Sequence, residues 1–267
     1  MATVYANKKV WDGGYQWTNR GDEWSVDWGG ASMQWYGAIL PRIHSHIPTD
    51  NILEIACGYG RWTQFLKNMC QNLVAIDLSE ECIQACRHRF SDFSHIEYHM
   101  NDGRSLHMIP DNSVDFVFSF DSLVHADESV MNGYLSQLPR ILKSDGAAFF
   151  HHSNLGEYQA IYSKIRKIPK LEGLLMQLGI LEKNLRWRDF SVSAKIVERL
   201  AEGHGLRCIS QEIIPWKTKR LSIDCLSTIV KDGSSMYRNN RIFRNVYFTR
   251  EVGYLSQLSQ LYATNKK

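Results

Sequence analysis

The sequence predicts a doubly wound α/β fold with a mostly parallel, seven-stranded sheet, and three observations support this prediction. Short apolar runs alternate along the chain with stretches whose apolar residues recur at helical spacing. The first of these runs ends in a glycine-containing turn, as expected where a strand leads directly into a helix. The length of 267 residues, of which 44% are hydrophobic, suits one large domain with a sizeable core. Because strands alternating with helices form parallel units, we expect the carboxyl ends of the strands at one edge of the sheet.

The expected elements follow one another from residue 51 onward. Strands are predicted over residues 51–56, 72–77, 96–102, 114–122 and 147–153. Helices are predicted between them, over residues 61–70, 79–90 and 131–142. Pro139 is expected to bend or break the last helix, and Lys143–Gly146 predicts a turn before the fifth strand. Patterns rich in β-forming residues return at residues 206–216, 224–230 and 241–249.

Two segments lie outside this alternation. Residues 1–50 contain five of the eight tryptophans, and we interpret them as an N-terminal lid. Within the lid, Trp35, Ile39 and Ile43 share one helical face, which predicts burial against the sheet. Residues 155–190 have a helical, polar-aromatic pattern and are interpreted as a cap inserted into the main domain, residues 51–267.

Composition narrows the class of protein. The net charge of +3 is nearly balanced and no run of like charges stands out, so neither a nucleic acid nor a membrane surface is expected as partner. Six cysteines without a CxxC pair favour a reduced, cytoplasmic protein. The first ten residues are polar, unlike a signal peptide, and no apolar run approaches the ~20 residues that span a bilayer. Oligomeric state is not predicted, and a small-molecule substrate is the expected partner.

The turn after the first strand, CGYG, indicates a nucleotide site. Gly58 and Gly60 are followed by residues 61–63 without the third glycine of a dinucleotide fingerprint. Glu54 stands just before the turn, where a carboxylate would oppose a pyrophosphate. The same carboxylate suits a ligand that carries an ammonium and a sulfonium, which disfavours an NAD-dependent oxidoreductase.

Polar residues also end the second and third strands. Asp77 lies about twenty residues after the turn, where an acid accepts hydrogen bonds from ribose hydroxyls. It is also placed as an acid at a helix start, beside Ser79. Asn101, Asp102 and Gly103 end the third strand, where an Asp can accept from an adenine amino group.

This order of residues resembles the class I S-adenosylmethionine-dependent methyltransferases over about residues 50–155. The resemblance rests on Glu54, Ala56, Gly58, Gly60, Asp77 and Asp102, with Ala56 standing where the family usually has glycine. It implies a Rossmann-like methyltransferase fold, S-adenosylmethionine as cofactor and S-adenosylhomocysteine as product. The cofactor-binding residues that it implies are Glu54, Ala56, Gly58, Tyr59, Gly60, Trp62, Asp77, Leu78, Asn101, Asp102, Gly103, Ser119 and Phe120.

Candidate catalytic residues follow the fourth and fifth strands. His125 is the first choice as general base. The run LVHADES resembles the segment that carries a histidine base in small-molecule O-methyltransferases, and the ordinary pKa of histidine lies near working pH. Its alternative is a helix-start histidine bonded to the backbone. His151 and His152 point to opposite faces of a strand, and His152 is favoured because it lies nearer the carboxyl edge. Asp121 could orient a histidine, bind the acceptor or serve as base.

Substrate contacts are expected from Trp24, Trp28, His151 and Arg188. The tryptophans can stack on a sugar face or contact a sulfonium, although most of these rings could simply bury the segment. Arg188 could bind an anionic or polyhydroxy acceptor, or lie in a solvated helix start. Mg²⁺ is possible through oxygens of Asp121, Asn154 and Asp224, but the spacing gives no compact signature and no metal site is predicted.

Three functions therefore remain open. The leading one is methylation of a hydroxyl on a sugar-containing or natural-product acceptor, because the N-terminal GDEWSVDWGG resembles a bacterial subgroup often found near glycan and natural-product gene sets. The second is N-methylation of a small amine or peptide, and the third is a non-catalytic S-adenosylmethionine-binding subunit.

Overall fold

An eight-stranded sheet forms the centre of the computed structural model, which describes residues 3–178, 181, 185, 187–216 and 221–262. The strand order is β3-β2-β1-β4-β5-β7-β6-β8. β7 runs antiparallel to both neighbours and the other pairs are parallel. The strands are β1 (Thr49–Ile55), β2 (Cys70–Asp77), β3 (Ile96–Met100), β4 (Val114–Ser119), β5 (Leu142–Ser153), β6 (Leu206–Ile214), β7 (Asp224–Lys231) and β8 (Arg241–Arg244). The mostly parallel sheet is confirmed, with a short eighth strand added at one edge.

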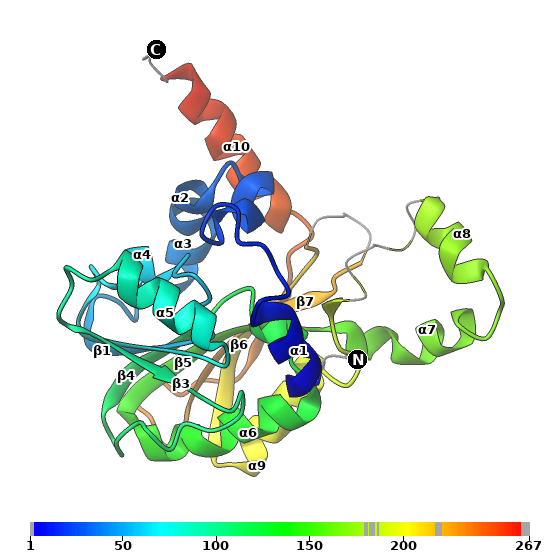
Figure 1. Ribbon diagram of the computed structural model, residues 1–267. Coiled ribbons are helices and arrows are strands. Elements are labelled where there is room, and N and C mark those ends of the chain that lie inside the picture. Colours follow the sequence, from blue (N-terminus) through cyan, green and yellow to red (C-terminus); the bar gives the residue numbers. More distant parts are fainter. Residues whose placement is uncertain (1–2, 179–180, 182–184, 186, 217–220, 263–267) are drawn as a thin grey trace.

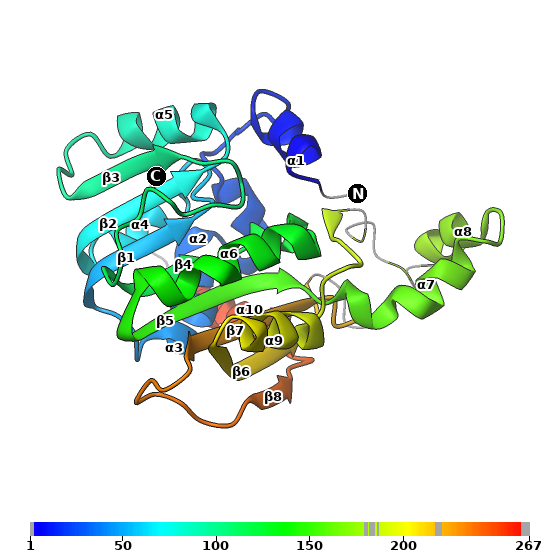
Figure 2. The same ribbon diagram turned by 90° about the horizontal axis from the view of Figure 1, so that it is seen from below.

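Helices cover both faces of this sheet (Figures 1 and 2). Around one face lie α2 (Ala31–Gln34), η2 (Trp35–Ile39), α3 (Leu40–Ile43), α4 (Thr63–Leu66), α5 (Glu80–Arg89) and the base of α10 (Phe248–Leu261). The other face is covered by α6 (Glu128–Ile141) and α9 (Ala194–Gly203). Each face has its own apolar core, so the sheet is buried on both sides, as a parallel sheet requires.

Local sequence explains where the helices around the site begin. The Ser79 hydroxyl accepts a hydrogen bond from the backbone N–H of Cys82 and starts α5. Asp127 starts α6 by accepting from the N–H of Val130 at 2.9 Å. α6 continues through Pro139 and ends two residues later, at Ile141, so the proline lies in the last turn of the helix.

Three expected elements differ in extent. The turn predicted at Lys143–Gly146 is instead an irregular part of β5, where the register against β4 shifts. The helix expected over residues 61–70 is the single turn α4. The strand expected over residues 241–249 ends at Arg244, after pairing with only four residues of β6, and α10 begins at Phe248.

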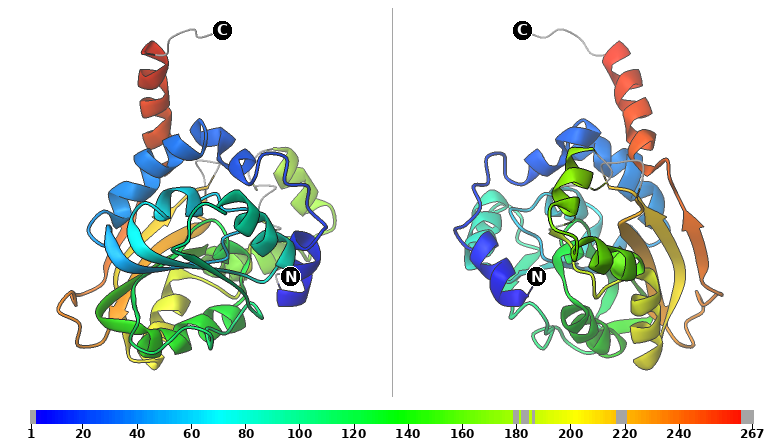
Figure 3. Two further views of the ribbon diagram at one scale, coloured as in Figure 1. Left: turned by 60° about the vertical axis from the view of Figure 1, so that its left-hand side comes forward. Right: turned by 90° about the vertical axis from the view of Figure 1, so that its right-hand side faces the viewer.

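The two segments outside the alternation are largely helical. Residues 1–50 contain α1 (Val4–Trp11), η1 (Asp22–Trp28), α2, η2 and α3, and residues 155–190 contain η4 (Leu155–Tyr158), α7 (Gln159–Ile165) and α8 (Leu171–Gln177). Trp35, Ile39 and Ile43 are fully buried, as predicted. α7 and α8 project to one side of the body, and α10 rises away from it (Figures 1 and 3). None of the described helices is both long and apolar enough to cross a membrane.

Candidate functional site

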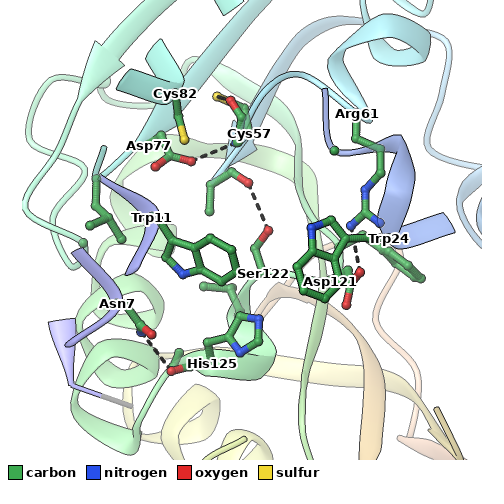
Figure 4. A pocket seen from close by; sticks show the side chains of 18 of the residues that line it. Asn7, Trp11, Trp24, Cys57, Arg61, Asp77, Cys82, Asp121, Ser122 and His125 are labelled. Carbon is green, nitrogen blue, oxygen red and sulfur yellow. Dashed lines mark hydrogen bonds and ion pairs between the residues drawn. The ribbon is translucent and has the colours of Figure 1, made fainter. Parts of the chain in front are cut away.

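A pocket opens at the carboxyl ends of β1, β2 and β4, where open α/β sheets bind ligands (Figure 4). Residues of α1, near the N-terminus of the chain, form part of the wall of this pocket. The predicted site residues that line it are Ala56, Gly58, Tyr59, Trp62, Asp77, Leu78, Gly103, Phe120, Asp121, His125, Trp24 and Arg188. The predicted residues that do not line it are Glu54, Gly60, Asn101, Asp102, Ser119, Trp28, His151 and His152.

The turn between β1 and α4 is built from left-handed backbone. Gly58 and Gly60 have φ of 55° and 82°, a region that glycine adopts at little cost. Ala56 has φ of 60° despite its β-carbon, so the turn forms without glycine at this point. The Ser122 hydroxyl, at the end of β4, donates to the Ala56 carbonyl at 3.0 Å and holds it in place.

Asp77 ends β2 with its carboxylate in the pocket wall. One carboxylate oxygen accepts from the backbone N–H of Gly58 and the other from that of Ser79, both at 2.9 Å. Burial raises the pKa of Asp77, and these two N–H groups oppose that effect. Asp77 thus both orders the turn and keeps lone pairs near the pocket, where Leu78 and Gly103 supply apolar wall. This combination fits a nucleoside, with a carboxylate for ribose hydroxyls and apolar surface for a base.

Glu54 lies behind the turn rather than in the pocket. Leu53 and Ile55 belong to the core under α6, so the alternation along β1 turns Glu54 towards α4. There it accepts a hydrogen bond from the Thr63 hydroxyl at 2.6 Å. Burial raises the pKa of Glu54 to about 8. Glu54 therefore does not line the pocket, and its expected contact with a positively charged ligand stays a prediction.

The residues after β3 hold their own loop. The Asp102 carboxylate accepts from the N–H groups of Arg104 and Ser105, and the Asn101 side chain donates to the Tyr134 hydroxyl. Neither side chain lines the pocket, and in this loop only Gly103 does.

The end of β4 supplies one pocket residue and one structural residue. The Ser119 hydroxyl, predicted as a cofactor contact, donates to the Ile55 carbonyl at 2.9 Å and ties β4 to β1. Phe120 reaches the pocket, and its carbonyl accepts from the indole N–H of Trp62. Gly60 faces Phe90 of α5 instead of the pocket.

Trp11, at the end of α1, is the centre of an aromatic cluster inside the pocket. Its ring centroid lies 5.5 Å from that of His125 and 5.7 Å from that of Trp17. Trp24 and Trp187 lie 6.2 and 6.3 Å away. Figure 4 shows Trp11 between Asp77 and His125. The cluster therefore brings tryptophans from the N-terminal segment together with Trp187, which precedes α9, in the wall of the pocket.

Two further aromatic residues expected at the site, Trp28 and Tyr59, lie in different places. Trp28 packs in the core, 4.5 Å from Trp216, and does not reach the pocket. Tyr59 does reach it and stacks on Trp17 with centroids 4.6 Å apart.

His125 is held in one tautomer. Its Nδ1 lies within hydrogen-bond distance of the Trp187 carbonyl, which can only accept, so Nδ1 carries the proton. The lone pair is therefore on Nε2. Burial and the charge of Arg188 lower the pKa of His125, so the ring is neutral at pH 7. A neutral imidazole with a fixed tautomer in a pocket can accept a proton.

Asp121 follows β4 and is fixed from two sides. Its carboxylate lies 2.8 Å from the guanidinium of Arg61. Its backbone N–H donates to His151 Nδ1 at 3.1 Å, in a turn where Asp121 has φ of 62°. His151 Nε2 in turn lies 3.3 Å from Asp224, and both side chains are fully buried. His151 therefore supports Asp121 from behind and does not line the pocket.

Arg188 is buried, unlike a residue in a solvated helix start. It donates to both oxygens of Asp224, at 2.7 and 2.6 Å. Burial alone would raise the pKa of Asp224, but the guanidinium outweighs it and lowers the value to about 2. The pair joins the segment before α9 to β7 and places Arg188 in the pocket wall.

His152, the favoured strand-five candidate, points away from the pocket. Its Nε2 lies 2.8 Å from the Ser227 hydroxyl and its ring is fully buried. Burial lowers its pKa to about 4. Both faces of β5 are covered, so nearness to the carboxyl edge does not bring this side chain to the site.

The oxygens considered for Mg²⁺ are engaged elsewhere: Asn154 bonds to Ser222 and Ala194, and Asp224 to Arg188. Among the residues that the structure describes, no group of three or more His, Cys, Asp or Glu is placed to hold a metal ion.

Comparison with known proteins finds a family that resembles the central part of this chain. Residues 52–146 match the family described as "Methyltransferase domain". The matched segment runs from β1 into β5 and includes the glycine turn, Asp77 and Asp121. Over residues 52–146, less than half of its length, the chain is therefore similar to a methyltransferase domain.

Relatives of the methyltransferase domain agree over part of their length. Nodulation protein S of Sinorhizobium fredii is 30% identical over 83 residues, which is 31% of this chain and 38% of that protein. The match thus spans about two fifths of the relative's length. A Pyrococcus horikoshii protein superposes with a TM-score of 0.53 at 20% identity, over 85% of this chain and 97% of that one. An S-adenosylmethionine-dependent methyltransferase from Mesorhizobium loti gives 0.53 at 15% identity, over 74% and 97%.

Several residues that line the pocket are not predicted from the sequence. Asn7 and Trp11 come from α1, and Trp17 from the loop that follows it. Only the richness of residues 1–50 in tryptophan hinted at these. Arg61 directly follows Gly60, but the sequence alone assigns it no role beyond membership of residues 61–63, which lack a third glycine.

Proposed function

We propose that the protein is an S-adenosylmethionine-dependent methyltransferase that methylates a hydroxyl of a small-molecule acceptor, with His125 as general base. The observation that carries the proposal is the fixed tautomer of His125, with its lone pair on Nε2 in a pocket that also holds Asp77. S-adenosylmethionine, when bound, supplies a methyl group activated by a sulfonium. Asp77 and Gly103 fit its nucleoside, and Leu78 adds apolar surface.

The residues of the chain then perform three tasks. The aromatic cluster around Trp11 excludes water and orients the acceptor, because alignment of the two reactants supplies much of the rate of a displacement. His125 Nε2 takes the hydroxyl proton, and the Trp187 carbonyl steadies the imidazolium that results through Nδ1–H. Indole faces suit a sugar-containing or planar natural-product acceptor.

The lid and cap interpretations belong to this proposal. α1 contributes Val4, Asn7 and Trp11 to the pocket, and the Asn7 amide donates to the His125 carbonyl at 3.0 Å. We therefore assign residues 1–50 the role of a lid that closes over cofactor and acceptor together. Among the described residues of 155–190, Trp187 and Arg188 are the two that line the pocket, at the end of the cap.

The decisive experiment compares His125→Ala and His125→Gln with the wild type on an acceptor that it methylates. We expect kcat to fall by roughly 10²–10⁴-fold, with affinity for S-adenosylhomocysteine unchanged in calorimetry. Because the pKa of His125 is lowered, wild-type kcat should decrease only below about pH 6.5, as the ring becomes protonated. An unaltered kcat in both variants would remove His125 from the role of base.

N-methylation of a small amine is the second candidate, favoured by one observation. Trp24 lies beside Asp121 in the pocket (Figure 4), and Trp11 and Trp17 line the same pocket, so that indole rings and a carboxylate are available to a cation. An amine that arrives neutral needs no base. Turnover of amines but not alcohols, with a His125→Ala enzyme of full activity, would select this reading. A protein that binds S-adenosylhomocysteine but methylates neither class would favour the non-catalytic subunit.

A further inference from the structure

Arg61 is a buried cation whose role the proposed function does not use. It directly follows Gly60, lines the pocket and is 8% exposed. One terminal nitrogen lies 2.8 Å from the Asp121 carboxylate and the other 3.4 Å from the Ser25 hydroxyl. The guanidinium lies over the Trp62 ring, 4.5 Å from its centre. These two hydrogen bonds use two of the five N–H donors of the guanidinium, which therefore retains donor capacity beside the glycine turn.

Arg188, the other arginine of the pocket wall, is placed differently. Both oxygens of Asp224 are engaged by Arg188 in a bidentate pair, so its charge is matched in a buried setting. His125 is neutral because burial lowers its pKa. Of the charged side chains that line the pocket, Arg61 is therefore the cation best able to accept another anion.

We propose that Arg61 binds the carboxylate of the methionine portion of S-adenosylmethionine, and that this carboxylate competes with Asp121 for the guanidinium. The inference rests on the proposed function. Arg61 and Asp121 follow β1 and β4, neighbouring parallel strands whose carboxyl ends form the pocket. Two carboxylates at one guanidinium repel each other, so the arrival of one weakens the hold on the other.

The exchange moves a side chain and leaves the backbone in place. The Asp121 N–H remains bonded to His151, and His151 remains against Asp224, so the turn is held while the carboxylate rotates. Asp121 is then released into the pocket, on the side where the acceptor would lie. Binding of cofactor thus completes the acceptor site, which couples the two binding events.

The test measures affinity for two ligands by calorimetry in the full-length protein. S-adenosylhomocysteine carries the carboxylate, whereas 5′-methylthioadenosine has the nucleoside and sulfur but no amino-acid portion. We expect Arg61→Gln to weaken S-adenosylhomocysteine roughly 10- to 100-fold and Asp121→Asn to tighten it roughly 3- to 10-fold. Neither variant should change affinity for 5′-methylthioadenosine. In the Arg61→Gln background, Asp121→Asn should no longer tighten binding.

Two further variants serve as controls in this test. The double variant carries no unpaired buried charge, so its affinities are informative even if Arg61→Gln alone folds poorly. Arg199→Gln removes an arginine of an exposed pair on α9 and should leave both affinities unchanged. Equal weakening of both ligands by Arg61→Gln, or no tightening by Asp121→Asn, would overturn this inference alone. Failure of the wild type to bind either ligand would overturn the proposed function with it.

Discussion

The buried carboxyl of Glu54 gives the protein a stability that depends on pH in a defined direction. In the folded state the pKa of Glu54 is about 8, whereas in the unfolded state the carboxyl has its ordinary pKa of about 4.5. Between these values the folded state binds more protons, so its stability falls as pH rises. The penalty is absent below pH 4.5, grows up to pH 8 and is constant above it.

Glu54→Gln removes this titration while keeping an oxygen for the Thr63 hydroxyl. The free energy of unfolding of the variant, relative to wild type, should rise by about 1.4 kcal/mol per pH unit, or roughly 4 kcal/mol between pH 5 and pH 8. Urea denaturation at several pH values measures the difference, in which all other titrations cancel. Glu80→Gln, an exposed carboxylate at the start of α5, is the control and should show no such trend. A Glu54→Gln difference that stays constant from pH 5 to pH 8 would refute the reasoning.

Three further variants probe the turn, the pocket acid and the base of α10. Gly60→Ala should lower the free energy of unfolding, measured by heat or urea, by about 2 kcal/mol more than Gly205→Ala does. Both glycines have a positive φ, but only at Gly60 would a β-carbon meet the Phe90 ring, at 2.4 Å. Asp77→Ala should lower the affinity for S-adenosylhomocysteine at least tenfold in calorimetry, and an unchanged affinity would exclude a contact between Asp77 and the ribose. The same variant should lower the free energy of unfolding by about 2 kcal/mol, since two backbone N–H groups lose their acceptor. Arg42→Met should lower the free energy of unfolding in urea by about 3 kcal/mol. The reason is that two glutamates, one of them on α10, lose the largely buried cation with which they pair.

The order of strands and helices was predictable from sequence because it depends on local periodicity. Asp77 was predictable for a similar reason: the end of a parallel strand fixes the edge at which a side chain lies, and the acid type limits what it can bind. The same argument does not bring Glu54 to the pocket wall, since alternation along the strand, and not nearness to the turn, decides which face a side chain takes.

What the sequence could not show depends on contacts between distant segments. Asn7 bonds to the His125 carbonyl across 118 positions of the chain, so no local pattern reveals that α1 lies on the pocket. The placement of the two histidines of β5 could not be predicted for another reason, which also lies in tertiary packing. Both faces of that strand are covered, and only the packing of Phe120 and Trp216 around His151 determines which ring lies behind the site.

The aromatic cluster around Trp11 gives this protein a built-in optical reporter. Trp11, Trp17, Trp24 and Trp187 share the pocket with the His125 ring, at separations where one indole alters the emission of the next. A ligand that parts α1 from the strand ends must change these separations. Occupancy can therefore be followed in unlabelled protein by tryptophan fluorescence, and replacing Trp11 by phenylalanine should remove most of the change.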